Sequence, residues 1–118
     1  MWMLSLEKLK MKDKKIQLDL NNPAFLERLQ ESWLKLDKSE RNRVTDTLKK
    51  LKQLTWDQAY RDQGIKWEKI SSVKPPAGIE VIYSLRITQS RRAVAYRDGD
   101  IMRLLLIAPD HDATYGMK

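Results

Sequence analysis

Apolar and polar residues alternate at the start of the chain and then switch to helical spacing. Residues 16–20, Ile-Gln-Leu-Asp-Leu, show the two-residue period of a half-buried strand. Asn21-Asn22-Pro23 ends that strand, and Asn22 is a good cap for a following helix. Pro23 suits the first helical position, where a missing N–H costs nothing. The pattern predicts a short strand followed directly by a helix.

Three helices are predicted in the first half of the chain. The first runs from about Pro23 to Leu36, and Asp37-Lys38-Ser39-Glu40 is typical of the cap of a second helix that reaches Leu54. Thr55-Trp56-Asp57-Gln58 repeats the cap signal and predicts a short third helix that ends at Gly64. The apolar positions assigned to the core are Phe25, Leu26, Leu29, Trp33, Leu36, Val44, Leu48 and Leu51.

The last part of the chain has the pattern of β-strands. Residues 65–69 and 79–88 alternate, and Pro75-Pro76 predicts a loop between them. A further strand is expected over residues 92–97, with Asp98-Gly99 as a two-residue hairpin signal. Ile101 to Ala108 is almost continuously apolar, as expected of a central strand that is covered on both faces.

This order of elements indicates an α+β fold. We expect an N-terminal strand and two to three helices packed on one face of a mainly antiparallel sheet of four to five strands. A length of 118 residues suits one domain. Residues 1–15 form a basic leader with little to bury, which assigns residues 16–118 to a single domain.

Charge and composition narrow the classes of function. The formal net charge is +7, which favours nucleic acid, an anionic membrane face or an acidic protein as partner. No apolar run is long enough to span a bilayer, the start of the chain lacks a signal-peptide pattern, and the absence of cysteine fits a reducing cytoplasm. With one histidine and no phosphate- or dinucleotide-binding glycine motif, we expect no metal and no cofactor.

Polar residues gather at one end of the predicted sheet. Arg86 faces the opposite side of its strand from Leu85, and Arg91-Arg92 opens the next strand after a short turn. In an antiparallel meander the last strand returns toward Arg92, which brings His111 and Tyr115 near the same edge. The sequence therefore predicts a cluster of arginines, a histidine and a tyrosine.

These side chains suit metal-free cleavage of an RNA backbone by the ribose 2′-OH. Histidine can move protons at cellular pH, arginine can neutralise the charge that grows on the phosphate, and tyrosine can orient it or stack on a base. A purely structural interpretation stays open. In that case Arg86 pairs with Asp110 or Glu80, His111 is an exposed loop residue, and Tyr115 covers the last strand.

The same residues carry a family resemblance. Tyr83-Ser84-Leu85-Arg86-Ile87, then Arg92-Ala93-Val94-Ala95-Tyr96, a hairpin and an apolar strand, resemble the RelE/ParE superfamily of bacterial toxins. The helical block over residues 22–54 matches that layout, so the likeness covers roughly residues 16–115. The ending His111-Asp112-Ala113-Thr114-Tyr115 resembles a subgroup with a C-terminal His-Asp-x-x-Tyr pattern.

The resemblance implies a toxin held inactive by a cognate antitoxin, with ribosome-dependent mRNA cleavage as the commonest activity. It implies that Arg86 contacts the scissile phosphate, that Tyr115 completes the site, and that Arg92 matches a recurrent arginine with a structural role. One departure is that Pro109-Asp110-His111 stands where RelE itself has a further arginine. His111 would replace that function, or nuclease activity would be lost.

Three functional hypotheses follow. The first is a ribosome-dependent endoribonuclease that uses Arg86, His111 and Tyr115. Its substrate contacts would come from Arg91 and Arg92, and from the basic outer face of the second helix, which includes Arg41, Lys49 and Lys50. The second is a non-enzymatic inhibitor of a protein such as DNA gyrase, bound through the helices. The third is a nucleic-acid-binding accessory domain, for which binding should fall with salt without cleavage.

Overall fold

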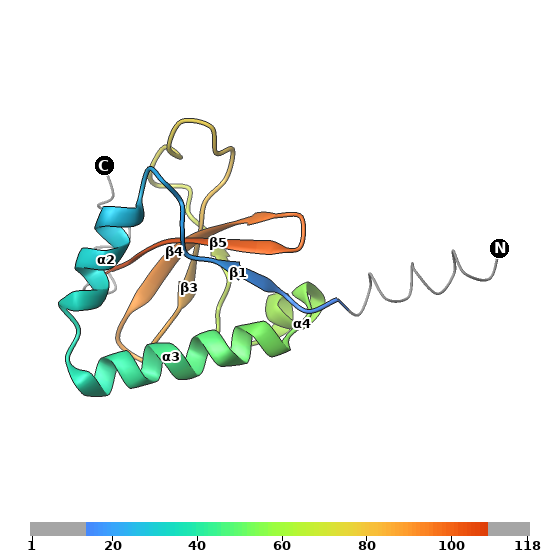
Figure 1. Cartoon of the computed structure of the whole chain (residues 1–118). Coiled ribbons are helices and arrows are strands. Elements are labelled where there is room, and N and C mark those ends of the chain that lie inside the picture. The colour runs from blue at the N-terminus through green and yellow to red at the C-terminus, as the bar shows by residue number, and fades with distance from the viewer. Residues whose placement is uncertain (1–13, 109–118) are drawn as a thin grey trace.

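Three helices and a five-stranded sheet make up residues 14–108, the part of the chain that the computed structural model describes (Figure 1). The helices are α2 (Leu26–Leu34), α3 (Lys38–Gln53) and α4 (Trp56–Arg61). The strands are β1 (Gln17–Asp19), β2 (Glu68–Lys69), β3 (Tyr83–Arg86), β4 (Arg92–Asp98) and β5 (Ile101–Ile107). The predicted α+β architecture is confirmed.

The sheet is mixed, in the order β1-β5-β4-β3-β2. β1 runs parallel to β5, while the other neighbouring pairs are antiparallel. Arg103 on β5 joins three strands, because its guanidinium contacts Asp98 of β4 at 2.9 Å and Asp19 of β1 at 3.0 Å. The hydrogen bonds to Asp98 and Asp19 hold the pKa of Arg103 above its ordinary value. These pairs help to fix the register of the short N-terminal strand.

Helix starts follow the predicted caps in two of three cases. The Asp37 side chain accepts a hydrogen bond from the Glu40 N–H at 2.7 Å, and Thr55 forms a reciprocal capping box with Gln58. The predicted start at Pro23 is wrong, since α2 begins at Leu26. The Asn22 side chain instead accepts from the Ala24 N–H at 3.0 Å and stabilises a turn before the helix.

The sheet is covered on both faces. On one face, α2, α3 and α4 pack against the strands through a cluster that includes Leu29, Val44, Leu51, Leu85 and Met102. Successive residues of a strand point to opposite faces, so Val94 and Leu105 belong to a second cluster with Phe25, Ile70 and Ile82. β5 contributes to both clusters, which confirms the prediction of a strand buried on both sides.

The strand that the alternating pattern over residues 79–88 predicts is longer than the one observed. β3 covers only Tyr83–Arg86. One further bond, from the Ile70 N–H to the Ile82 carbonyl at 3.0 Å, precedes it, and the chain before Ile82 lies outside the sheet. The apolar side chains of Ile79 and Val73 instead pack on the second cluster, and so they cover a face of the sheet without belonging to a paired strand. The hairpin turn is also shifted by one residue, since β4 includes Asp98 and Gly99 adopts a φ of +61°.

Asp62 shapes the segment that leads from α4 to β3. Its Oδ1 accepts from the Ile65 N–H at 2.9 Å, its carbonyl accepts from the Lys66 N–H at 3.2 Å, and its carboxylate pairs with Lys50 at 3.0 Å. Burial alone would raise the pKa of Asp62, but the hydrogen bonds from Lys50 and Ile65 and the charge of Lys50 outweigh it and lower that pKa. The ionised form is therefore the one that the fold stabilises.

We predict that Asp62→Asn lowers the free energy of unfolding at neutral pH by about 0.5–1 kcal/mol, because Lys50 is half exposed. A carboxylate with a lowered folded-state pKa contributes stability above its unfolded pKa and loses it as the pH falls through the folded value. The gap between wild type and variant in urea unfolding should thus close on acidification. A gap that stays constant into acid would contradict this assignment.

Candidate functional site

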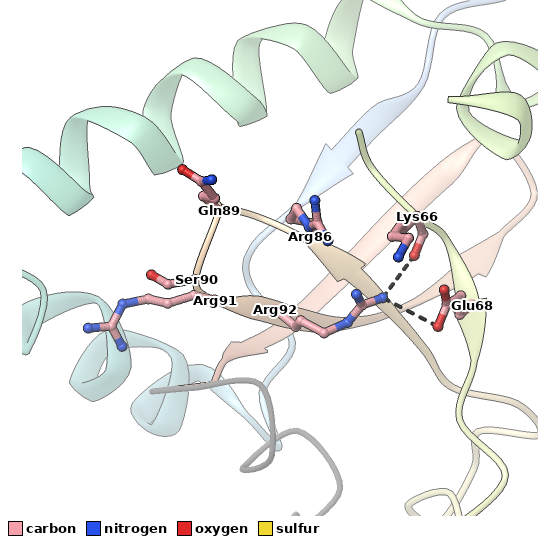
Figure 2. Close-up of a pocket in the computed structure, with 7 residues that line it drawn as sticks. All are labelled: Lys66, Glu68, Arg86, Gln89, Ser90, Arg91 and Arg92. Carbon is pink, nitrogen blue, oxygen red and sulfur yellow. Dashed lines mark hydrogen bonds and ion pairs between the residues drawn. The ribbon is translucent and has the colours of Figure 1, made fainter. Parts of the chain in front are cut away.

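The pairing of β3 with β4 ends where Arg86 lies opposite Arg92, beside the turn that joins the two strands. A hollow of about 490 Å³ opens at this end of the sheet (Figure 2). We call it the arginine hollow. It is lined by Lys66, Glu68, Arg86, Gln89, Ser90, Arg91 and Arg92.

Arg92 forms the floor of the arginine hollow and is only 4% exposed. Its Nε and Nη2 both donate to the Ser84 hydroxyl, at 3.1 and 2.8 Å, and Nη2 also donates to the Lys66 carbonyl at 2.9 Å. Glu68 adds an ion pair at 3.8 Å (Figure 2). Because a buried charge must be hydrogen-bonded to be tolerated, these contacts define a scaffolding position.

Lys66 lies in a conformation that non-glycine residues seldom adopt, with a φ of +49°. The segment is fixed on both sides, since the Ile65 carbonyl accepts from the Arg86 N–H at 2.6 Å and the Lys66 carbonyl accepts from Arg92. These bonds attach the loop after α4 to β3 and to β4. Such strained positions persist only where their surroundings hold them, and they occur often at functional sites.

Arg86 differs from Arg92 in its surroundings. Its half-buried side chain makes no ion pair or side-chain hydrogen bond within residues 14–108, and Figure 2 shows it standing apart from the Arg92 contacts. The predicted structural pairing with Glu80 is not formed, while Asp110 lies outside the described residues. Arg86 is therefore available to an anion that enters the hollow.

A second hollow, of about 460 Å³, adjoins the first and shares Arg86 and Gln89 with it. Its other walls include Arg43, Asp46 and Lys50 of α3. Arg86 thus lies between two hollows, one at the sheet edge and the other against the helix. Gln89, exposed at the tip of the turn, offers an amide that can donate and accept hydrogen bonds.

Arg91 lies on the far side of the turn and points away from Arg92 (Figure 2). Its Nε pairs with Glu40 at 3.3 Å, and the Ser90 hydroxyl donates to the same carboxylate at 3.4 Å. Both charged side chains are largely buried, so this pair connects the turn to the start of α3. Arg91 contributes positive charge to the rim of the arginine hollow and anchors the turn that carries Gln89.

The basic residues predicted on the second helix are not equivalent. Arg41 donates to the Leu36 carbonyl and closes the connection between α2 and α3. Lys50 pairs with Asp62 and lines the second hollow, while Lys49 is exposed and outside both hollows. Lys49 and Arg43 therefore remain as solvent-facing cations on α3.

His111 and Tyr115 lie outside the described residues, so their predicted positions are not tested. The predicted return of the last strand is seen up to Ala108, whose N–H donates to the Arg92 carbonyl at 2.8 Å. Ala108, the last described residue, therefore lies beside Arg92.

Lys66, Gln89 and Ser84 belong to this site although the sequence pattern did not single them out. Lys66 lines the hollow because the backbone turns there in a left-handed conformation, which no local sequence motif predicts. Gln89 lines it because it lies in the tight turn between β3 and β4. The only sequence signal for Ser84 is that it alternates on the same strand face as Arg86.

The charge of the arginine hollow defines what it can bind. Four of its lining side chains are cationic and one, Glu68, is acidic. Within residues 14–108 no group of three or more acidic or histidine side chains is placed to hold a metal ion. Forked guanidinium donors and a lysine suit phosphate oxygens, and an exposed amide suits a base edge.

Comparison with known proteins finds no protein-family model and no curated protein that matches the chain. Within the described part of the chain, no helix is long and apolar enough to cross a membrane.

The two facing arginines should respond differently to substitution. Arg92→Ala should lower the free energy of unfolding by about 3 kcal/mol, because it leaves the Ser84 hydroxyl and Lys66 carbonyl without their buried partner. Arg86→Ala should change it by no more than about 0.5 kcal/mol. Urea unfolding of both variants measures this difference. Equal losses would contradict the separation into scaffold and binding residue.

Proposed function

We propose that this protein is the toxin of a toxin–antitoxin system and acts in the cytoplasm as a ribosome-dependent, metal-independent endoribonuclease on mRNA. The observation that carries the proposal is Arg86, which makes no ion pair within residues 14–108 and lies between two hollows rich in cationic side chains. The resemblance of residues 83–87 and 92–96 to the RelE/ParE superfamily supports mRNA as the anion.

In the proposed reaction the ribose 2′-OH attacks the adjacent phosphate and the 5′-oxygen leaves. Arg86 stabilises the charge that develops on the phosphate oxygens, and Lys66 adds a second cation at the same hollow. His111 moves the protons and Tyr115 orients the phosphate. The roles of these two residues rest on the sequence pattern. Arg92 keeps β3, β4 and the Lys66 segment in place without touching the substrate.

Docking on the ribosome is assigned to the outer face of α3. Arg43 and Lys49 are exposed there, and Lys50 lines the hollow that adjoins Arg86. Cations of this kind bind phosphates regardless of sequence, so they would position the protein while contacts near Gln89 select the cleavage point. A cognate antitoxin is the proposed protein partner.

A non-enzymatic inhibitor of a protein target such as DNA gyrase is the alternative. One observation favours it: Leu34, at the end of α2, is 77% exposed, and it neighbours the half-buried Trp33. Exposed apolar side chains mark a protein-binding surface only when they form a contiguous patch, so Leu34 would have to be joined by its neighbours. This alternative predicts that toxicity depends on α2 and not on Arg86.

The deciding experiment maps mRNA cuts by primer extension, with programmed ribosomes and with the same mRNA free in solution. Wild type should cut only on the ribosome. Arg86→Gln should slow cutting about 10²- to 10³-fold, as expected when one donor to a charged transition state is lost. His111→Ala and Tyr115→Ala should also slow it.

Arg61→Gln is the matched control, since Arg61 is an exposed arginine at the end of α4 and lines neither of the two hollows that share Arg86. It should cut like wild type. If folded wild-type protein makes no cuts, the nuclease proposal fails and the protein-target alternative gains. If Arg86→Gln cuts at the wild-type rate, the site is wrongly assigned.

A further inference from the structure

A third hollow lies at the other end of β4, beside the hairpin that joins β4 to β5. Its volume is about 530 Å³. We call it the tyrosine hollow, because Tyr60, Tyr83 and Tyr96 line it together with Arg97. It forms where the chain before Tyr83 leaves the sheet, so β4 continues past the end of its pairing with β3.

A ladder of aromatic rings supports the tyrosine hollow from below. Tyr60 packs on Trp56 with ring centres 5.6 Å apart, Trp56 meets Trp67 edge-on at 5.2 Å, and Trp67 stacks on Tyr83 at 4.7 Å. Trp56 is buried and its indole N–H donates to the Asp100 carbonyl at 3.1 Å. The ladder therefore presents its two end rings, Tyr60 and Tyr83, on a rigid base.

Arg97 is held beside these rings in a fixed orientation. Its guanidinium lies 4.7 Å from the Trp56 ring centre and 5.7 Å from that of Tyr60. Nη1 donates to the Tyr60 hydroxyl at 2.7 Å, and Nε donates to the Gly99 carbonyl at 2.8 Å. Within residues 14–108 Arg97 forms no ion pair, although Glu80 and Asp98 border the same hollow. Asp98 is itself bound by Arg103.

This combination is unusual for a purely structural cluster. Tyr60 is 47% exposed although the rest of the ladder is largely covered, and Arg97 is exposed as well. A flat ring and a flat guanidinium on a rigid base are the groups on which unstacked bases of single-stranded RNA stack. The guanidinium also offers charge to the adjoining phosphate.

We propose that the tyrosine hollow binds an unstacked base of the single-stranded RNA substrate. The inference rests on the proposed function and deepens it by adding a second contact on the same strand of RNA. Arg92 and Arg97 are five residues apart on β4, which corresponds to about 16 Å. The phosphate at Arg86 and the base at Tyr60 therefore belong to different nucleotides of the same RNA strand.

The test measures binding of a fluorescently labelled single-stranded RNA at low salt, beside the same RNA with abasic nucleotides. Tyr60→Leu should bind the intact RNA about tenfold more weakly, which is the loss expected when one stacked base is released. Tyr60→Phe keeps the ring and should retain most of the affinity. Arg61→Gln, on the same helix, is the control for loss of a cation outside the hollow. For abasic RNA, wild type and Tyr60→Leu should bind alike.

A crosslink provides a readout that needs no variant. RNA with 4-thiouridine, irradiated with wild-type protein and mapped by mass spectrometry, should attach near Tyr60, Tyr83 or Arg97. If Tyr60→Leu binds intact RNA as wild type does, or if crosslinks avoid this region, the inference is overturned. In that case the proposed function is retained if Arg86→Gln binds the RNA more weakly than wild type. If folded wild type binds no RNA, this inference also fails, and cleavage on ribosomes decides the proposed function separately.

Discussion

The candidate site depends on the burial of one guanidinium. Removing an arginine from water costs several kcal/mol unless its donors are satisfied. Arg92 satisfies them with the Ser84 hydroxyl and the Lys66 carbonyl, so the β3–β4 hairpin is joined to the more distant Lys66 segment at one point. That junction holds the left-handed turn at Lys66 from the side of the sheet, while Asp62 holds it from the side of α4.

The buried charge of Arg92 also contributes to the electrostatic surroundings of Arg86. Arg92 adds positive potential beneath the hollow while its own donors are occupied, and Glu68 is the only acidic side chain among the lining residues within 14–108. Arg86 is directly opposite in the register and has no carboxylate partner in the described chain. Two arginines that look alike in the sequence therefore have different surroundings: Arg92 is buried and hydrogen-bonded, while Arg86 is the residue proposed to contact an anion.

Much of the fold is readable from local patterns. The caps at Asp37 and Thr55 and the apolar run of β5 gave correct elements, because each depends on contacts within a few residues or on burial of a whole strand. The pattern failed before Ile82, where the apolar side chain of Ile79 packs on the face of the sheet instead of belonging to a paired strand.

The site was harder to predict than the fold. Alternation placed Arg86 and Arg92 near each other, and the register confirms that proximity. The alternating pattern could not show that the Ser84 hydroxyl and the Lys66 carbonyl would bind Arg92 and not Arg86. That choice depends on Lys66, which reaches the site through a long-range contact. The tyrosine hollow was missed for the same reason, since Tyr60 and Arg97 are 37 positions apart.

If Arg86 binds the anion and Arg92 holds the fold, NMR of the two arginine side chains should tell them apart. The Nε–Hε resonances of both residues would be followed as a short single-stranded RNA is added. The Arg86 resonance should shift as RNA is added, and this shift should become smaller as the salt concentration rises. The Arg92 resonance should keep its position, and its Nε–H proton should exchange slowly with water. A shift of the Arg92 resonance with an unchanged Arg86 resonance would rule out this division of roles.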